Sequence, residues 1–167
     1  AVTSVVEHPA TQQPLALLEA DGWTIHRLKV DTDGRIDPGT IPSGPLGLGP
    51  LILAQNEIGT IQPVASFAEA VHASGGVVHA DAAQAVGKIP VDVGELRVDL
   101  LSVAGHKLYA PKGVGALYLR RGTAIAPVLV GAGQERGLRP GTENVASIVG
   151  LGVAAELAAG LLATEPA

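Results

Sequence analysis

Short apolar and β-branched runs alternate along this chain with segments of helical periodicity, and no other feature restricts its fold as strongly. Such alternation is typical of α/β domains, in which helices connect parallel strands and pack on both faces of the sheet. A length of 167 residues fits a single domain. We therefore predict one α/β domain over residues 1–167, with three layers (α/β/α) and a mostly parallel sheet.

Glycines and prolines set the expected boundaries of these elements. The segment 38–50 contains four prolines and four glycines, so we expect a loop there rather than a helix. The predicted strands cover residues 2–7, 23–30, 51–55, 77–80, 98–103 and 114–119. The predicted helices cover residues 9–20, 63–74 and 144–162.

Composition excludes several kinds of chemistry. The sequence contains no cysteine, which excludes disulfides, thiolate metal ligands and a cysteine nucleophile within these residues. It contains no methionine either, so we expect a processed or trimmed part of a longer chain. The net charge is −5 and the largest basic cluster is the pair Arg120-Arg121, so we expect no nucleic-acid partner.

Neither end of the chain suggests export or membrane insertion. The first residues lack the basic flank that precedes the apolar core of a signal peptide. Residues 145–163 are apolar, but Glu156 interrupts them, and their alanines and glycines make them weakly hydrophobic. We therefore expect a cytoplasmic protein without a membrane span.

Polar side chains follow three successive apolar runs of the predicted sheet. Open α/β sheets bind their ligands beyond the carboxyl ends of the strands, so these side chains gather at one edge if the strands are parallel. Taken singly, an aspartate there can cap a helix and a lysine can be a solvated charge. The set is Asn56, Asp81, Gln84, His106 and Lys107.

A lysine and an aspartate at the mouth of an apolar cleft are what pyridoxal phosphate requires. The amine of Lys107 would form the Schiff base, and the carboxylate of Asp81 would keep the ring nitrogen protonated, which strengthens the electron sink. Gly105 leaves room for the cofactor, and Asn56 and Gln84 can donate hydrogen bonds to the ring oxygen. The sequence thus predicts a pyridoxal phosphate site.

A metal site is the competing interpretation of some of these residues. His79, Asp81 and His106 include ligand types that bind transition metals. On an alternating strand, however, a packed His79 is the simpler explanation, and we expect no metal ion. A serine hydrolase is disfavoured because no Gly-x-Ser-x-Gly segment occurs.

Beyond these residues, the chain resembles the cysteine desulfurases and selenocysteine lyases, members of the class V aminotransferase branch of fold-type I pyridoxal phosphate enzymes. The similarity follows that family's order and spacing across almost the whole chain, in the segments SVVEHPA, NEIGTIQPV, HADAAQAVGKIPVDV, DLLSVAGHKLYAPKGVGALYLRRG and GAGQERGLRPGTEN. It implies removal of sulfur or selenium from L-cysteine or L-selenocysteine, leaving alanine. It also implies a homodimer with shared sites and a sulfur-acceptor protein as a further partner.

The resemblance implies a role for each polar residue around the ring. His8 would stack on the cofactor ring and take part in catalysis. Asn56 and Gln84 would contact the ring oxygen, and Asp81 would contact the ring nitrogen. Lys107 would be the Schiff-base lysine and, after substrate displaces it, the base that removes the Cα proton.

The contacts to the phosphate are implied less completely. The resemblance puts His106 near the phosphate and Thr142 on the phosphate of the neighbouring subunit. Many members of the family carry a serine two residues before the histidine of the His-Lys pair, whereas this chain has Ala104 there. Ser102, two residues earlier, is the remaining candidate.

The family's chains are more than twice as long as this one. Their phosphate loop precedes the segment matched here, and their small domain, with the nucleophilic cysteine and the substrate-binding arginine, follows it. We therefore expect a truncated core of the large domain. Two alternatives stay open at this point: another class V aminotransferase or β-eliminase, and a non-catalytic remnant that serves dimerisation.

Overall fold

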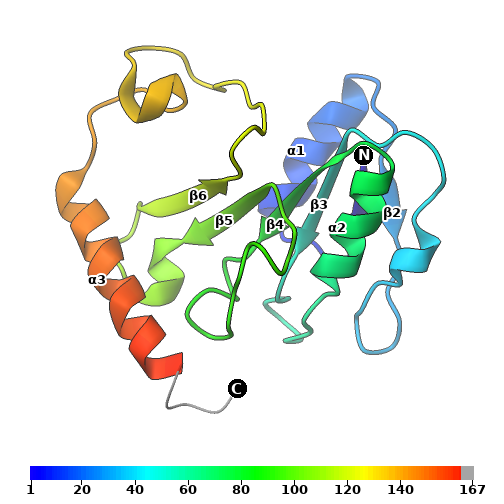
Figure 1. The fold of residues 1–167 in the computed structure, drawn as a ribbon, viewed down its shortest axis with the longest axis horizontal. Coiled ribbons are helices and arrows are strands. Elements are labelled where there is room, and N and C mark those ends of the chain that lie inside the picture. The colour runs from blue at the N-terminus through cyan, green and yellow to red at the C-terminus, as the bar shows by residue number, and fades with distance from the viewer. Residues whose placement is uncertain (163–167) are drawn as a thin grey trace.

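The computed structural model describes residues 1–162 and shows strands and helices in alternation (Figure 1). Its strands are β1 (Val2–Ser4), β2 (His26–Leu28), β3 (Leu48–Ile52), β4 (Val77–Asp81), β5 (Leu100–Ala104) and β6 (Gly115–Leu119). Its α-helices are α1 (Pro9–Ala20), α2 (Val64–Ala73) and α3 (Val145–Leu162). Three short 3-10 helices complete the described part: η1 (Pro38–Thr40), η2 (Gly105–Leu108) and η3 (Gln134–Gly137).

The strands are mostly parallel, as predicted. Strands β3, β4, β5 and β6 form one sheet in that order, in which β3, β4 and β5 are parallel and β6 is antiparallel to β5. Strands β1 and β2 form a separate parallel pair, and β1 lies beside β3. The carboxyl ends of β3, β4 and β5 therefore meet at one edge.

Helices cover both faces of β3, which confirms the three-layer prediction. Leu51 packs in the main core with the fully buried Phe67 and Val71 of α2. Leu48, which points to the opposite face, packs with Leu15 of α1. Successive side chains of a strand alternate between faces, so one five-residue strand contributes to both interfaces.

No α-helix forms over residues 38–50, as predicted, but the predicted loop is too long, because β3 begins at Leu48 and a single 3-10 turn forms at η1. The amide of Leu53 and the carbonyl of Gly47 both bond to β4, so the backbone groups of odd-numbered residues in this strand point toward β4. The backbone groups of the even-numbered residues between them, including Pro50, point toward β1 instead. Proline is tolerated in a strand where no ladder bond is required of its nitrogen.

Strand β1 is shorter than predicted because a side chain turns the backbone. The hydroxyl of Ser4 accepts a hydrogen bond from the amide of Val6 at 3.2 Å and donates one to the carboxyl of Glu7 at 2.5 Å. The chain then enters α1, with His8 as the N-cap residue. This turn delivers Glu7 and His8 to the same edge of the sheets as the ends of β3, β4 and β5.

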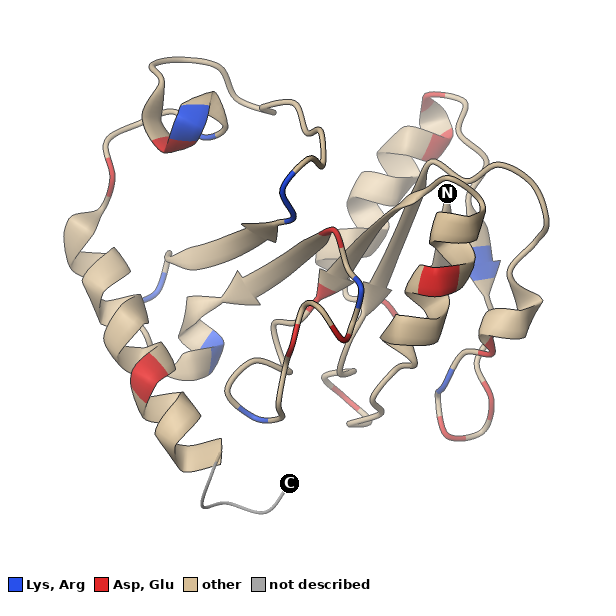
Figure 2. Ribbon diagram, viewed as in Figure 1, with Lys and Arg blue, Asp and Glu red and all other residues tan. Residues whose placement is uncertain are grey.

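Helix α3 is apolar on all sides and only partly covered. Leu151, Ala154 and Ala158 pack on η2, while Val149 and Leu157 are more than half exposed. Glu156 is its one charged residue, and Figure 2 shows the rest of this helix without charged positions. By length and composition alone α3 could cross a membrane. Ala163, the last residue of the apolar stretch, lies outside the described residues.

Candidate active site

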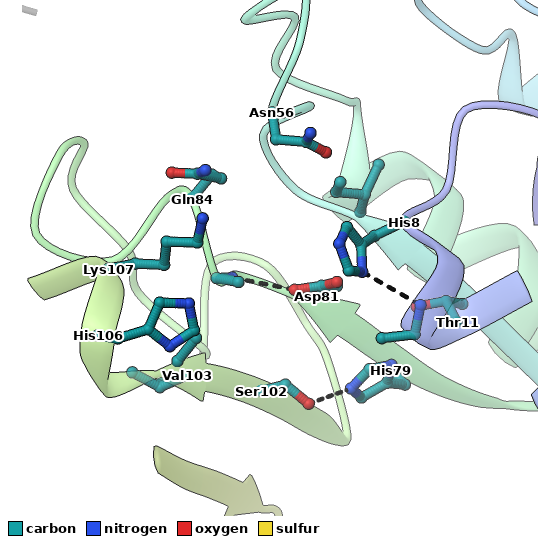
Figure 3. Close-up of a pocket in the computed structure, with 14 residues that line it drawn as sticks. His8, Thr11, Asn56, His79, Asp81, Gln84, Ser102, Val103, His106 and Lys107 are labelled. Carbon is teal, nitrogen blue, oxygen red and sulfur yellow. Dashed lines mark hydrogen bonds between the residues drawn. The ribbon is translucent and has the colours of Figure 1, made fainter. Parts of the chain in front are cut away.

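The edge where the parallel strands end carries a cleft of about 360 Å³. Seven of the eight predicted site residues line it, together with His79 and Thr11 (Figure 3). The seven are His8, Asn56, Asp81, Gln84, Ser102, His106 and Lys107. The structure thus brings residues from four separate strand ends into one site of the size that small-molecule ligands occupy.

Asp81 is the most deeply placed of the predicted polar residues. It is the last residue of β4 and only 9% exposed. Its Oδ1 accepts a hydrogen bond from the amide of Ala83 at 3.0 Å, and its carbonyl accepts one from the amide of Leu53 at 2.8 Å. Both bonds hold the carboxylate at the floor of the cleft, where a cationic group would find a fixed negative partner.

Lys107 lies in η2, the tight turn that follows β5. The amide of Gly105 bonds to the carbonyl of Val114 at 3.0 Å, and Tyr109 closes the turn in the left-handed conformation with φ of 62°. His106 and Lys107 both extend into the cleft from this turn, and the amine of Lys107 points toward Gln84 (Figure 3). A lysine on a short, bonded turn has a fixed backbone from which its amine enters the cleft.

His8 faces the cleft from the start of α1. Its Nδ1 accepts a hydrogen bond from the amide of Ala10 at 3.1 Å, so the N-cap bond fixes one ring nitrogen as the acceptor. In the neutral ring, Nε2 then carries the proton. Figure 3 shows the imidazole beside Asp81, across the cleft from Lys107.

Ser102 already has a hydrogen-bond partner in this structure. Its hydroxyl lies 2.7 Å from Nε2 of His79, on the neighbouring strand. Burial lowers the pKa of His79, and the charge of Asp81 opposes that shift. His79 is therefore a packed histidine, as the sequence predicts, and within residues 1–162 no three His, Asp or Glu side chains are grouped to hold a metal ion.

Asn56 and Gln84 flank the mouth of the cleft. Gln55 builds the turn that carries Asn56, because its Oε1 accepts hydrogen bonds from the amides of Glu57 and Ile58 at 2.6 and 2.8 Å. Gln84 is half-buried, and its Oε1 accepts a hydrogen bond from Nζ of Lys88 at 2.6 Å.

Thr142 is the one predicted site residue that lies elsewhere. It lines a separate depression with Gly113, Arg139, Asn144 and Ile148. Its assignment to the phosphate of a neighbouring subunit stays a prediction.

Sequence reasoning missed Glu7, which lies next to His8. Its side chain is 4% exposed, and its Oε2 has no hydrogen-bond partner. Burial raises the pKa of Glu7 to about 7, and the charge of Asp81 adds to this, against hydrogen bonds from Ser4 and the backbone of Ile52. The only available signal was its position as the last residue of a predicted strand, directly before the predicted site histidine.

Comparison with known proteins agrees with this geometry. The family model of the class V aminotransferases matches residues 1–165. Cysteine desulfurases from Klebsiella pneumoniae and Azotobacter vinelandii (NifS) are 49% and 48% identical over 160 residues, which cover 94% of this chain and 40% of each relative. The chain thus spans about 40% of the length of these curated relatives.

Solved structures show the same similarity. A NifS-like protein superposes with a TM-score of 0.92 and 38% identity, covering 97% of this chain and 46% of that one. DndA from Streptomyces lividans superposes with a TM-score of 0.88 and 39% identity, covering 97% of this chain and 48% of that one. With a matching family model over nearly all residues, a shared fold and the strand-end cleft, this chain belongs to the class V aminotransferase family.

Proposed function

We propose that this chain is the cofactor-binding core of a pyridoxal phosphate-dependent cysteine desulfurase, which removes sulfur from L-cysteine and leaves alanine. The observation that carries the proposal is the placement of Lys107 and the buried Asp81 in one cleft, with His8 beside them. The similarity to named cysteine desulfurases supports the activity. The solved structure of SspA in complex with cysteine, which is 36% identical to this chain with a TM-score of 0.88, supports the substrate class.

The residues of the cleft fit the cofactor chemically. Asp81 offers a fixed carboxylate for a protonated ring nitrogen, and Lys107 offers the amine for the Schiff base. Asn56 and Gln84 carry amide donors for an ionised ring oxygen, and His8 supplies a flat side chain for the ring face. When bound, pyridoxal phosphate supplies an electron sink for the negative charge that develops at the substrate Cα. In that reaction Lys107 takes the Cα proton at Nζ.

The phosphate contacts and the assembly form the less constrained part of the proposal. We assign His106 and Ser102 to the phosphate end of the cleft, and Thr142 to the phosphate of a second subunit in a homodimer. Ser102 would exchange its bond with His79 for one with the phosphate. The sulfur acceptor is then a separate protein, and the compartment is the cytoplasm.

The test is the visible spectrum of the 167-residue chain after addition of pyridoxal phosphate. We expect a yellow Schiff-base absorption with the unaltered chain and none with Lys107→Ala, because the amine at position 107 is the group that condenses with the aldehyde. Lys112→Ala is the matched control. Lys112 is exposed and close to Lys107 in the sequence, but it does not line the cleft.

Two results would contradict the assignment. An equal absorption with Lys107→Ala would show that other amines react, and loss of the absorption with Lys112→Ala would place the Schiff base outside the cleft. Circular dichroism of each variant separates a lost amine from a lost fold.

A further inference from the structure

We propose that Lys88 is a positioning residue, which holds the carboxamide of Gln84 so that its NH2 group, and not its oxygen, faces the ring oxygen of the cofactor. The inference rests on the proposed function, because it concerns the same cleft. Lys88 does not line the cleft itself.

The contact between Lys88 and Gln84 fixes which way the amide points. Nζ of Lys88 lies 2.6 Å from Oε1 of Gln84. An amine of lysine donates hydrogen bonds to an amide oxygen, so the oxygen of Gln84 has to be the atom on this side. The NH2 group then lies on the other side of the carboxamide and is available as a donor. Figure 3 shows the nitrogen of Gln84 nearer to Lys107 and the cleft than its oxygen is.

An ionised ring oxygen needs a donor and is repelled by an amide oxygen. An unconstrained glutamine can present either its amide oxygen or its NH2 group, because rotation about χ3 has a broad distribution with no single preferred angle. Only one of the two orientations contributes a hydrogen bond to the cofactor. A residue outside the cleft that donates a hydrogen bond to the amide oxygen therefore increases the fraction of protein molecules whose Gln84 NH2 group faces the cofactor.

The backbone holds Lys88 in the required place. The turn that connects Gln84 to Lys88 is closed by hydrogen bonds from the amides of Lys88 and Ile89 to the carbonyl of Ala85, each at 3.0 Å. Gly87 has a φ of +79°, and any side chain there would collide with Leu108 of η2. The turn is thus packed against the element that carries Lys107, so Lys88 and Lys107 share one depression.

The proximity of the two lysines also appears in their electrostatics. Burial lowers the pKa of Lys88, and the charge of Lys107 lowers it further. Both the charged and the neutral amine of Lys88 can donate to Gln84, so the contact does not depend on either protonation state.

The experiment is a double-mutant cycle on cofactor affinity and spectrum. We expect Lys88→Met to weaken pyridoxal phosphate binding by roughly twofold to tenfold, the range that one hydrogen bond contributes. We also expect it to move part of the visible absorption to shorter wavelength, because the ring oxygen loses its donor. Lys88→Arg keeps a donor and should restore both properties, whereas Lys112→Met, at an exposed lysine outside the cleft, should change neither.

The Gln84→Ala background decides how Lys88 acts. If Lys88 works through Gln84, adding Lys88→Met to Gln84→Ala has no further effect on affinity or spectrum. If Lys88→Met weakens binding equally with and without Gln84, Lys88 acts directly on the cofactor or on Lys107, and the inference is wrong. An unchanged affinity and spectrum for Lys88→Met in the native background would also overturn it.

A measurement without cofactor separates this inference from the proposed function. The side-chain NH2 signals of Gln84 in an NMR spectrum of the chain should move with Lys88→Met and stay in place with Lys112→Met. If they move but the native chain never binds pyridoxal phosphate, the proposed function fails while the contact stands. If the chain binds the cofactor and Lys88→Met leaves the Gln84 signals unmoved, the positioning role fails alone.

Discussion

Replacing Gly105 with alanine is expected to lower the free energy of unfolding by about 3 kcal/mol, the upper end of the usual cost of overpacking. The new Cβ would lie 2.5 Å from the carbonyl oxygen of Val114 and 3.0 Å from its Cγ1. That oxygen already accepts the hydrogen bond of the Gly105 amide, so no side-chain rotation can relieve the collision. Strand β6 has to move away from β5. Urea unfolding of the two proteins measures the loss.

The same substitution should also reduce cofactor binding, because the displaced turn carries His106 and Lys107. Gly133→Ala is the matched control: a Cβ there meets nothing within 4 Å, and its φ of −81° suits alanine. Equal unfolding free energies for Gly105→Ala and Gly133→Ala would show that the β5–β6 turn adapts to a side chain. The claim that this turn holds Lys107 in a fixed position would then be wrong.

The second large effect concerns Glu7 and depends on pH. The pKa of Glu7 is raised from its ordinary value to about 7, so the folded state favours the protonated carboxyl. The contribution of protonated Glu7 to the free energy of unfolding is fully present below the ordinary pKa of a glutamate. It is lost as the pH rises through about 7. Glu7→Gln stays neutral at every pH and keeps the shape of the side chain. Relative to the native chain, it should therefore gain roughly 2–3 kcal/mol of stability between pH 5 and pH 8.

Urea unfolding of both proteins at pH 5 and pH 8 gives the difference that isolates Glu7 from other titrating groups. Glu95→Gln, at an exposed glutamate, should follow the native chain at both values. The prediction is refuted if the native chain and Glu7→Gln lose or gain stability in parallel across this range.

Much of the fold follows from the sequence because burial in an α/β domain leaves a periodic pattern. Apolar runs located β4, β5 and β6 to within two residues at each end. Strand β3 was misplaced because its Gly49 and Pro50 are residues that usually interrupt strands. Their tolerance depends on which neighbour each backbone group faces, and that neighbour is known only once the sheet has formed.

The site was predictable to the extent that it depends on strand ends. Asp81 and Lys107 follow apolar runs directly, so parallel strands bring them together. Glu7 was not predictable, because an acid in an alternating segment is expected to face solvent, and its burial arises from Ser4 and the adjacent β3. The bond between Ser102 and His79 likewise requires the register of β4 and β5, which no local pattern in the sequence specifies.

The division of the strands into two sheets places the two sides of the cleft on separately paired strands. His8 follows β1, whereas Asp81 and Lys107 belong to the sheet that begins at β3. Within residues 1–162, β1 and β3 are joined by packed side chains and not by a ladder of backbone hydrogen bonds. The two walls of the cleft, one carrying His8 and the other Lys107, are thus held together by side-chain packing between two separately paired sheets.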